Sequence, residues 1–342
     1  MKRHPPRLFS VRRMEDDMKT TATIAGLLML PAVAGAQTLT VYTYDSFVPD
    51  WGPGPAIEEA FEAQCGGCDL EFVAAGDGAA LLSRLRLEGE RTEADIILGL
   101  DTNLMAAARD TGLLAPHGVE AQFDLPISWE DDTFLPYDWG HFAFVADADT
   151  PAPSSFRDLA ESDLRLAIQD PRSSTPGLGL VLWVEAAHGD DAAAIWEGLA
   201  DNVLTVTPGW SEAYDLFLSG EADAVLSYTT SPAYHLIAEE DDSKVAWAFD
   251  EGHYMQIEVA AIVAGTDQPD LARDFMAFIA TDAFQSVIPT TNWMYPAVVP
   301  EGGLPEGFDT LVQPDVSLLF PPEEAADRRE GAIATWRDAL AQ

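Results

Sequence analysis

A run of hydroxyl side chains precedes an apolar helical pattern at 177–188. It lies in the segment 170–177 (DPRSSTPG), where Thr175 is a suitable helix N-cap and Pro176 suits the first helical position. Because the free N–H groups and partial positive charge of a helix N-terminus attract anions, Ser174 and Thr175 could help bind a phosphate or another anion. The alternative interpretation of the same pattern is simple helix capping.

A carboxylate occupies a similar position elsewhere. Asp77 follows a strand-like run at 70–74 and precedes a helical pattern at 79–88. It could cap that helix, with Gly78 easing the turn. The alternative is a carboxylate held at a strand end, where it faces a cation or an amino group.

Large aromatic residues also stand at the ends of elements: Trp210, Tyr228, Tyr234 and Trp293. Trp210 precedes a helical pattern that we expect to be capped by Ser211, and the position where an apolar staple partner belongs is Asp215. Such rings can stack on a flat or cationic ligand, or they can be ordinary core residues. The sequence leaves both interpretations open.

The elements that must position these residues alternate between strands and helices. Strand-like runs at 39–44, 70–74 and 95–100 are separated by helical patterns at 55–64 and 79–88, with another at 103–111. This order predicts an open, mostly parallel sheet. Ligands bind beyond the carboxyl ends of the strands in such sheets. That rule selects Tyr44, Asp77, Asp101 and the segments 170–177 and 228–231.

A second set of elements follows, and then a long apolar strand at 257–264 that could return to the first set. The second set has strands at 142–145, 166–169, 224–228 and 245–249. No single linker separates the two sets, which favours two lobes joined by several crossings. We expect lobe 1 to begin with residues 37–138, lobe 2 to comprise 139–253, and residues 254–342 to return to lobe 1 and add C-terminal helices.

The N-terminus has the pattern of an export signal. Lys19 precedes an apolar run at 22–33, and Ala34-Gly35-Ala36 is a small-x-small cleavage site. We therefore expect residues 1–36 to be a signal peptide, cut after Ala36. The acidic residues at 15–17 fit such a signal poorly, so we expect the true start to be Met18.

The net charge excludes two classes of partner, and the cysteine spacing indicates the role of the two cysteines. The formal net charge of −40 excludes nucleic acid and anionic lipid as partners. Cys65 and Cys68 form a C-x-x-C pair, and no second pair completes a four-ligand zinc site. Export to an oxidising compartment then predicts a structural disulfide.

Enzyme signatures are missing from the sequence. It contains no G-x-S-x-G, H-E-x-x-H, G-x-x-x-x-G-K or G-x-G-x-x-G motif, and its histidines are scattered. We expect a binding protein with no catalytic residues, no cofactor and no metal.

Several blocks of sequence resemble the periplasmic thiamine-binding proteins of bacterial ABC importers. The resemblance covers about 39–336, and its blocks include 39–47 (LTVYTYDSF), 51–55 (WGPGP), 169–179 (QDPRSSTPGLG), 209–214 (GWSEAY), 226–234 (LSYTTSPAY), 251–254 (EGHY) and 292–296 (NWMYP). The sequence departs from the family pattern by a shorter segment near 147–155 and by its cysteine spacing.

This resemblance implies a type II periplasmic-binding-protein fold, an α/β fold whose two lobes, each with a mostly parallel central sheet, close by a hinge over a ligand cleft. The implied ligand is thiamine or its mono- and diphosphate, and the implied partner is an inner-membrane ABC permease with its ATPase subunit. The implied ligand contacts are Tyr44, Asp77, Ser174, Trp210, Tyr228, Tyr234 and Trp293, with Thr175 and Gly177 at the helix start.

In this interpretation the rings hold the thiazolium cation, Asp77 meets the aminopyrimidine, and Ser174 receives the hydroxyl or phosphate. We expect a periplasmic monomer. Two alternatives remain: another solute on the same scaffold, either a polyamine or ferric iron held by Tyr228 and Tyr234, and a hydrolase that acts on thiamine.

Overall fold

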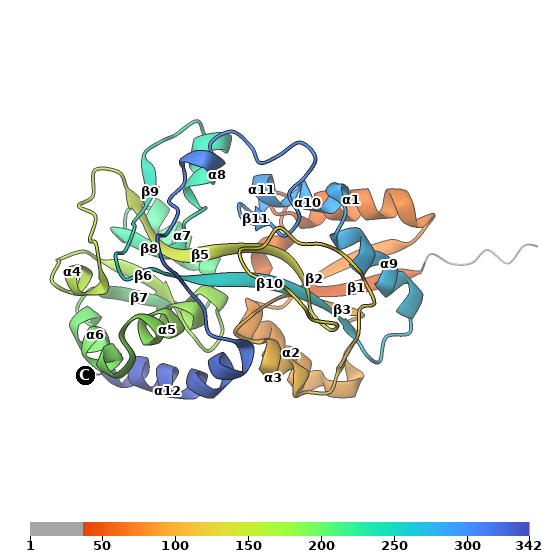
Figure 1. Cartoon of the computed structure of the whole chain (residues 1–342), viewed down its shortest axis with the longest axis horizontal. Coiled ribbons are helices and arrows are strands. Elements are labelled where there is room, and N and C mark those ends of the chain that lie inside the picture. Colours follow the sequence, from red (N-terminus) through yellow and green to blue (C-terminus); the bar gives the residue numbers. More distant parts are fainter. Residues whose placement is uncertain (1–36, 342) are drawn as a thin grey trace, which may run out of the picture. The chain divides into compact units, whose positions relative to one another are not determined.

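The computed structural model describes residues 37–341 (Figure 1). The expected signal peptide and the expected start at Met18 lie outside the described residues. Within them, twelve strands form one connected arrangement whose main path is β2-β1-β3-β10-β5-β8-β6-β7. The chain is thus an α/β protein in which elements distant in sequence share a sheet.

The first end of the sheet is parallel. It consists of β1 (Thr38–Thr43), β2 (Asp69–Ala74) and β3 (Ile96–Asp101), with β1 in the middle. The connecting helices are α1 (Gly54–Cys65) and α2 (Gly78–Glu88), and α3 (Met105–Arg109) follows β3. Every residue of β3 is buried, as expected for a strand covered on both faces.

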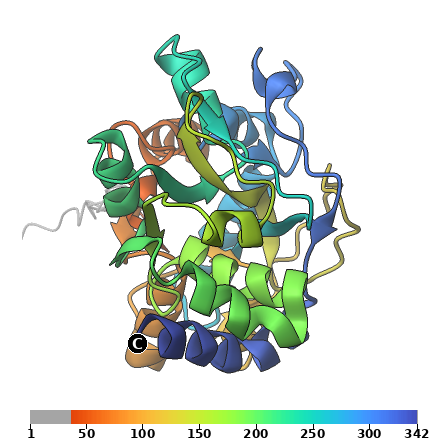
Figure 2. The ribbon, with the colours of Figure 1, turned by 90° about the vertical axis from the view of Figure 1, so that its left-hand side faces the viewer.

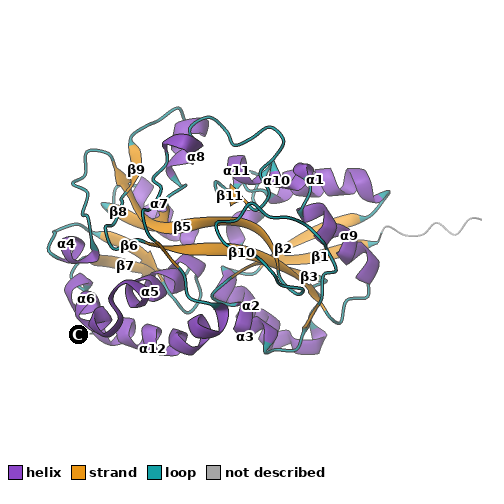
Figure 3. Cartoon of the chain, in the orientation of Figure 1, coloured by secondary structure: helices purple, strands orange, loops and turns teal. Residues whose placement is uncertain are grey.

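The other end of the sheet repeats this pattern. Its strands β6 (Leu166–Gln169), β7 (Val203–Thr207) and β8 (Ala224–Tyr228) are parallel, with β6 in the middle. Its helices are α4 (Phe156–Ala160), α5 (Thr175–His188), α6 (Ala192–Leu199), α7 (Trp210–Leu218) and α8 (Pro232–Ala238). Figure 3 shows α4, α5, α6 and α7 near β6, β7 and β8, whereas α8 lies beside β9.

Two long strands connect the ends of the sheet. β5 (Leu135–Asp147) and β10 (His253–Val263) pair with each other in antiparallel register, and β10 also pairs with β3. β5 pairs with β10 up to His141 and with β8 from Phe142 onward. The chain therefore crosses between the two ends along continuous strands, as the lack of a single linker indicates.

The remaining elements complete the layers. They are α9 (Pro269–Ile279), α10 (Asp282–Gln285), α11 (Ile288–Thr291), α12 (Pro322–Leu340), the short strands β4 (Leu114–Ala115), β9 (Lys244–Ala246), β11 (Tyr295–Pro296) and β12 (Ser317–Leu318), and four 3-10 turns at Asp45–Phe47, Gly89–Arg91, Gly189–Asp191 and Phe308–Thr310. The terminal helix α12 packs against α3, α5 and α6, so it contacts helices from both ends of the sheet (Figure 2). Among residues 37–341, no helix is long and apolar enough to cross a membrane.

The predicted strands and helices are largely confirmed, and the main differences are strand β7, which the sequence analysis missed, and the extents of β5 and β10. The sequence predicts strands at 142–145 and 257–264, whereas the observed strands begin at Leu135 and His253. Their first halves contain buried polar residues such as Asp138 and Gln256, which interrupt the apolar pattern.

Close packing of α5 on the sheet depends on one glycine. Ten of the fourteen residues of α5 are buried, among them Trp183 in the largest core cluster. A Cβ added at Gly179 would lie 2.0 Å from the ring of Phe142 in β5. The helix can therefore approach the strand this closely only because position 179 has no side chain.

The predicted disulfide between Cys65 and Cys68 is confirmed, with the two Cα atoms 5.7 Å apart. It joins the end of α1 to the start of β2. Gly66 and Gly67 between them have φ angles of 71° and 114°, a backbone conformation that glycine adopts at little cost.

We expect a double substitution Cys65→Ser and Cys68→Ser to lower the free energy of unfolding by about 2 kcal/mol, because the unfolded chain regains the freedom of a short closed loop. Urea titration of the variant measures this change. Wild-type protein with a reduced disulfide should give the same midpoint as the variant. An unchanged midpoint in both would show that the crosslink does not contribute to stability.

Candidate ligand-binding site

A cavity of about 620 Å³ lies between the part of the sheet formed by β1, β2 and β3 and the part formed by β6, β7 and β8. Its lining comes from segments that are far apart in sequence. Tyr44 directly follows β1, Tyr228 ends β8, Thr175 begins α5, and Glu258 belongs to the shared strand β10. The cavity thus lies beyond strand ends, where an open α/β sheet is expected to bind its ligand.

Seven of the nine predicted contact residues line this cavity: Tyr44, Asp77, Thr175, Trp210, Tyr228, Tyr234 and Trp293. The other two, Ser174 and Gly177, do not. Ser174 is fully buried, and Gly177 lies so close to the Gln169 carbonyl that an added Cβ would come within 2.5 Å of its oxygen. These two residues therefore shape the cavity from behind its wall.

Trp210 packs against an aromatic partner that the sequence prediction missed. Its ring and that of Tyr214 have centroids 4.8 Å apart, and its Nε1–H donates to Ser227 Oγ at 2.8 Å. The predicted N-cap, Ser211, is wrong, because α7 already begins at Trp210, after Gly209. This one-residue shift places Tyr214 one helical turn along the same face as Trp210.

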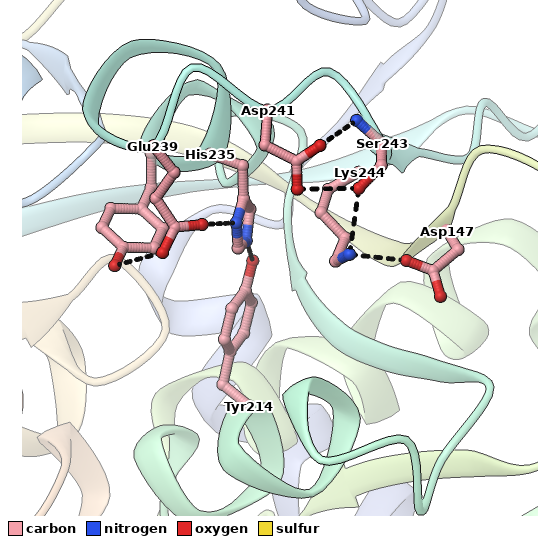
Figure 4. A network of polar contacts seen from close by, with 8 residues as sticks. Asp147, Tyr214, His235, Glu239, Asp241, Ser243 and Lys244 are labelled. Atoms are coloured by element: carbon pink, nitrogen blue, oxygen red, sulfur yellow. Dashed lines mark hydrogen bonds and ion pairs between the residues drawn. The ribbon is translucent and has the colours of Figure 1, made fainter.

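A polar network behind the wall holds Tyr214 and Tyr234 (Figure 4). A hydrogen bond of 3.0 Å joins the Tyr214 hydroxyl to His235 Nε2, and His235 Nδ1 lies 2.6 Å from Glu239. The Tyr234 hydroxyl donates to the same carboxylate at 3.0 Å. His235 and Glu239 thus fix two rings of the cavity through one carboxylate.

His235, Glu239 and Asp241 also bring potential metal-ligand atoms within 4.8 Å of one another. These atoms already have other partners, since His235 and Glu239 bond each other and Asp241 accepts from Ser243 at 2.8 and 2.9 Å. We interpret the cluster as a support for α8.

Asp77 occupies the N-cap position of α2, but its carboxylate lines the cavity and does not cap the helix. It precedes α2, but its side chain makes no hydrogen bond to that helix. Instead, its Oδ2 accepts from the Ser174 hydroxyl at 2.7 Å and from the Trp210 backbone N–H at 3.2 Å. Burial raises the pKa of Asp77 to about 6, and these two hydrogen bonds oppose the rise.

The hydroxyls at the start of α5 are engaged within the protein. Helix α5 begins at Thr175 with Ser174 as its N-cap, so the prediction of Thr175 as N-cap is wrong. Thr175 Oγ1 accepts from the Gly78 N–H at 3.1 Å, and Ser173 donates to the Pro208 carbonyl at 2.6 Å. Arg172 pairs with Asp170 and does not line the cavity.

The floor of the cavity contains a carboxylate that sequence reasoning missed. Glu258 accepts from the Tyr137 hydroxyl at 2.6 Å and from Gln256 at 2.9 Å. A charged residue within the otherwise apolar run at 257–264 is the signal that could have identified it. Burial raises the pKa of Glu258 to about 7.

Asn292 links Asp138 of β5 to Tyr44 in the cavity lining, a contact that the sequence analysis also missed. Its side-chain amide donates to Asp138 at 2.6 Å and its oxygen accepts from the Tyr44 hydroxyl at 3.1 Å. The next residue, Trp293, has a φ of 56°, which is uncommon for a bulky residue. Backbone strain at such a position suggests a functional reason for the tryptophan.

The cavity lining has one sign of charge. Asp77, Asp215 and Glu258 line it, and no lysine, arginine or histidine of the described chain does. Around them stand the rings of Trp210, Tyr214, Tyr234 and Trp293, with Trp51 at 56% exposure. Aromatic faces and carboxylates together favour a flat, positively charged ligand.

The raised carboxyl pKa values predict that the empty protein is more stable at pH 5 than at pH 8. Asp101, like Asp77 and Glu258, has a raised pKa, of about 7, because of burial. These three carboxyl groups therefore bind more protons in the folded state than in the unfolded state between pH 4 and pH 7, so their contribution to stability falls as pH rises. Burial lowers the pKa of His141 to about 4, which opposes part of this trend, but one histidine offsets less than three carboxyl groups. A tenfold tighter hold on one proton corresponds to about 1.4 kcal/mol, so the total should be on the order of a few kcal/mol.

Thermal melts between pH 5 and pH 8 measure this effect. Added salt controls for repulsion among surface charges, which it screens far more than it affects buried groups. The substitution Asp101→Asn should flatten the profile. A melting temperature that falls from pH 8 to pH 5 would contradict the prediction.

Comparison with known proteins agrees with this geometry. A family described as bacterial extracellular solute-binding protein matches residues 40–290. The thiamine-binding periplasmic protein of Escherichia coli is 52% identical over 321 residues, which cover 92% of this chain and 97% of that protein. A solved structure of a periplasmic thiamin binding protein has 51% identity and a TM-score of 0.87, over 90% of this chain and 97% of that one.

More distant structures share the fold alone. Iron-bound HitA from Pseudomonas aeruginosa is 19% identical, with a TM-score of 0.70 over 89% of this chain and 99% of that one. The architecture is the type II periplasmic-binding fold, as the sequence resemblance implies. The chain belongs to the bacterial extracellular solute-binding proteins, and it is similar over nearly its full length to members named for binding thiamine in the periplasm.

Proposed function

We propose that this protein captures thiamine in the periplasm and delivers it to an ABC importer. The observation that carries the proposal is the cavity itself, in which aromatic rings surround carboxylates and no cationic side chain of the described residues takes part. Thiamine offers a matching surface, since it joins a permanently cationic thiazolium to a flat aminopyrimidine. The sequence identity to thiamine-binding periplasmic proteins supports the same ligand.

The aromatic rings would hold the cation. A desolvated cation over an aromatic face gains about 2 kcal/mol, and less where water remains. Trp210 and Trp293 stand on different elements and face the same cavity, together with Tyr44, Tyr228 and Tyr234. A ring system could therefore be enclosed from two sides, with Trp51 at the rim.

Asp77 would recognise the aminopyrimidine. Its Oδ2 already accepts two hydrogen bonds, which leaves Oδ1 to accept from an amino group. Ser174 would then act through Asp77, by orienting the carboxylate. A phosphate ester of thiamine would meet the start of α5, where Thr175 lines the cavity and Gly177 allows close backbone packing.

Delivery requires a change that a permease can sense. We assign residues 37–138 and part of 254–342 to lobe 1 and residues 139–253 to lobe 2, with the signal peptide at 1–36. The change of partner strand in β5, between His141 and Phe142, supports a hinge there. Closure of a monomer over thiamine would present both lobes to an inner-membrane permease with its ATPase subunit.

The alternatives have less support. Ferric iron held by Tyr228 and Tyr234 would need two free phenol oxygens, but these donate to Gln256 and Glu239. A polyamine has no aromatic system that would use the rings of the cavity. The relatives are named as binding proteins, which supports capture without turnover.

We expect Asp77→Asn to weaken thiamine binding about 10- to 100-fold, since a hydrogen bond to a charged group contributes about 1.5–3 kcal/mol. Isothermal titration calorimetry measures the affinity. The variant should melt no lower than wild type at pH 8, because a buried charge has been removed.

The 4′-oxo analogue of thiamine, which lacks the amino group, provides a matched control. It should bind wild type more weakly than thiamine does, and this difference should shrink in Asp77→Asn. If the analogue binds more weakly than thiamine by the same factor in wild type and in Asp77→Asn, the carboxylate does not contact the amino group.

We expect Trp293→Gly to separate binding from stability. Glycine relieves a left-handed backbone conformation that costs other residues about 1–2 kcal/mol, which offsets part of the lost ring packing. Thiamine affinity should fall at least tenfold, because a stacking face is gone. Thermal melts and calorimetry on the same samples measure both effects, and unchanged affinity would exclude Trp293 from the ligand contacts.

A further inference from the structure

Three acidic residues lie side by side across the middle of the sheet. Glu258 in β10 is directly opposite Asp101 in β3 and directly opposite Asp138 in β5. Asp101 and Asp138 have no exposed surface, and Glu258 has 6%. Residues directly opposite in adjacent strands have neighbouring side chains, so like charges there repel each other.

The hydrogen bonds at the Glu258–Asp138 pair leave one oxygen unsatisfied. Both oxygens of Glu258 accept, from Tyr137 and from Gln256. Asp138 Oδ2 accepts from Asn292, whereas Asp138 Oδ1 is buried without a partner. A proton on this carboxyl pair would satisfy that oxygen and remove the repulsion.

The titratable groups that face the pair, from its own strands and from other elements, bring no compensating positive charge. They are Tyr44 after β1, Asp77 before α2, Asp101 in β3, Tyr137 in β5 and Tyr228 in β8. Arg329 of α12 interacts electrostatically with the neighbouring Asp101, where its positive charge opposes the rise in the pKa of that carboxyl group. Burial and mutual repulsion raise the pKa of both Asp138 and Glu258.

We propose that Glu258 is a further ligand-recognition residue and that the Glu258–Asp138 pair holds a proton in the empty cavity and releases it when a cation binds. The inference rests on the proposed function in taking thiamine as that cation. The carboxyl O–H bond breaks and the proton passes to solvent. The positive charge of the thiazolium is permanent because its nitrogen is alkylated and not protonated, so the ring becomes the counter-charge of the carboxylate.

This arrangement selects by charge as well as by shape. A neutral molecule of the same outline would leave the proton in place and gain no ion pairing with Glu258. A cation gains that pairing and must displace the proton, which is harder at low pH. Affinity for thiamine should therefore rise with pH up to the pKa of the pair and level off above it, by at most tenfold per pH unit for one proton.

Calorimetry of thiamine binding in buffers with different ionisation enthalpies tests the proposal. At pH 6, the buffer dependence of the enthalpy should reveal release of close to one proton per ligand, and release should decline toward zero at pH 8.5. An enthalpy independent of buffer, with an affinity independent of pH, would overturn the proposal. Failure to bind thiamine at all would instead overturn the proposed function.

Substitutions locate the proton. Glu258→Gln and Asp138→Asn should each remove most of the release at pH 6, and Glu258→Gln should also lower affinity about tenfold at pH 8. Asp223→Asn is the control, because Asp223 is a carboxylate outside the cavity lining that pairs with Arg165. It should keep the release of wild type.

Asp77 is the competing source of the proton, because its pKa is also raised. Release that persists in Glu258→Gln but disappears in Asp77→Asn would overturn the assignment to the Glu258–Asp138 pair. Thermal melts of each variant distinguish a folded protein without release from an unfolded one.

Discussion

A group of buried carboxyl groups with no cationic side chain in the described cavity lining is the constraint on which this structure depends. Four buried or half-buried carboxyl groups, Asp77, Asp101, Asp138 and Glu258, lie in or beneath one cavity, and the described lining supplies no cation. Buried charges are costly unless they are paired. The empty protein can take up protons, and a cationic ligand can replace them, so an unfavourable feature of the fold becomes the basis of its selectivity.

The topology makes this concentration of charge possible. The two shared strands, β5 and β10, pass through the middle of the sheet, and they place Asp138 and Glu258 directly opposite each other. The same strands join the two lobes that would close over a ligand. A change in the charge of the Glu258–Asp138 pair therefore occurs close to the proposed hinge in β5. The charge of the ligand and the closure of the lobes could be coupled through the backbone of these strands.

The sequence predicts the local features well and the long-range ones poorly. Strand and helix patterns depend on neighbouring residues, so β1–α2–β3 and the disulfide follow from periodicity and spacing. The pairing of Glu258 with Asp138 depends on the register between two segments that are far apart in the chain, which no local pattern encodes. Ser174 illustrates the same limit, because its hydrogen-bond partner Asp77 lies 97 residues earlier in the chain and no local pattern predicts that contact.

The acidity of the whole chain and that of the cavity have different physical consequences. The net charge of −40 is spread over a solvated surface, where salt screens it within about 10 Å. The cavity carboxylates are shielded from that screening by burial. Surface charge can therefore raise the local concentration of a cation, but it cannot distinguish one cation from another. Discrimination must come from the few buried oxygens that a ligand touches directly, among rings that fix its orientation.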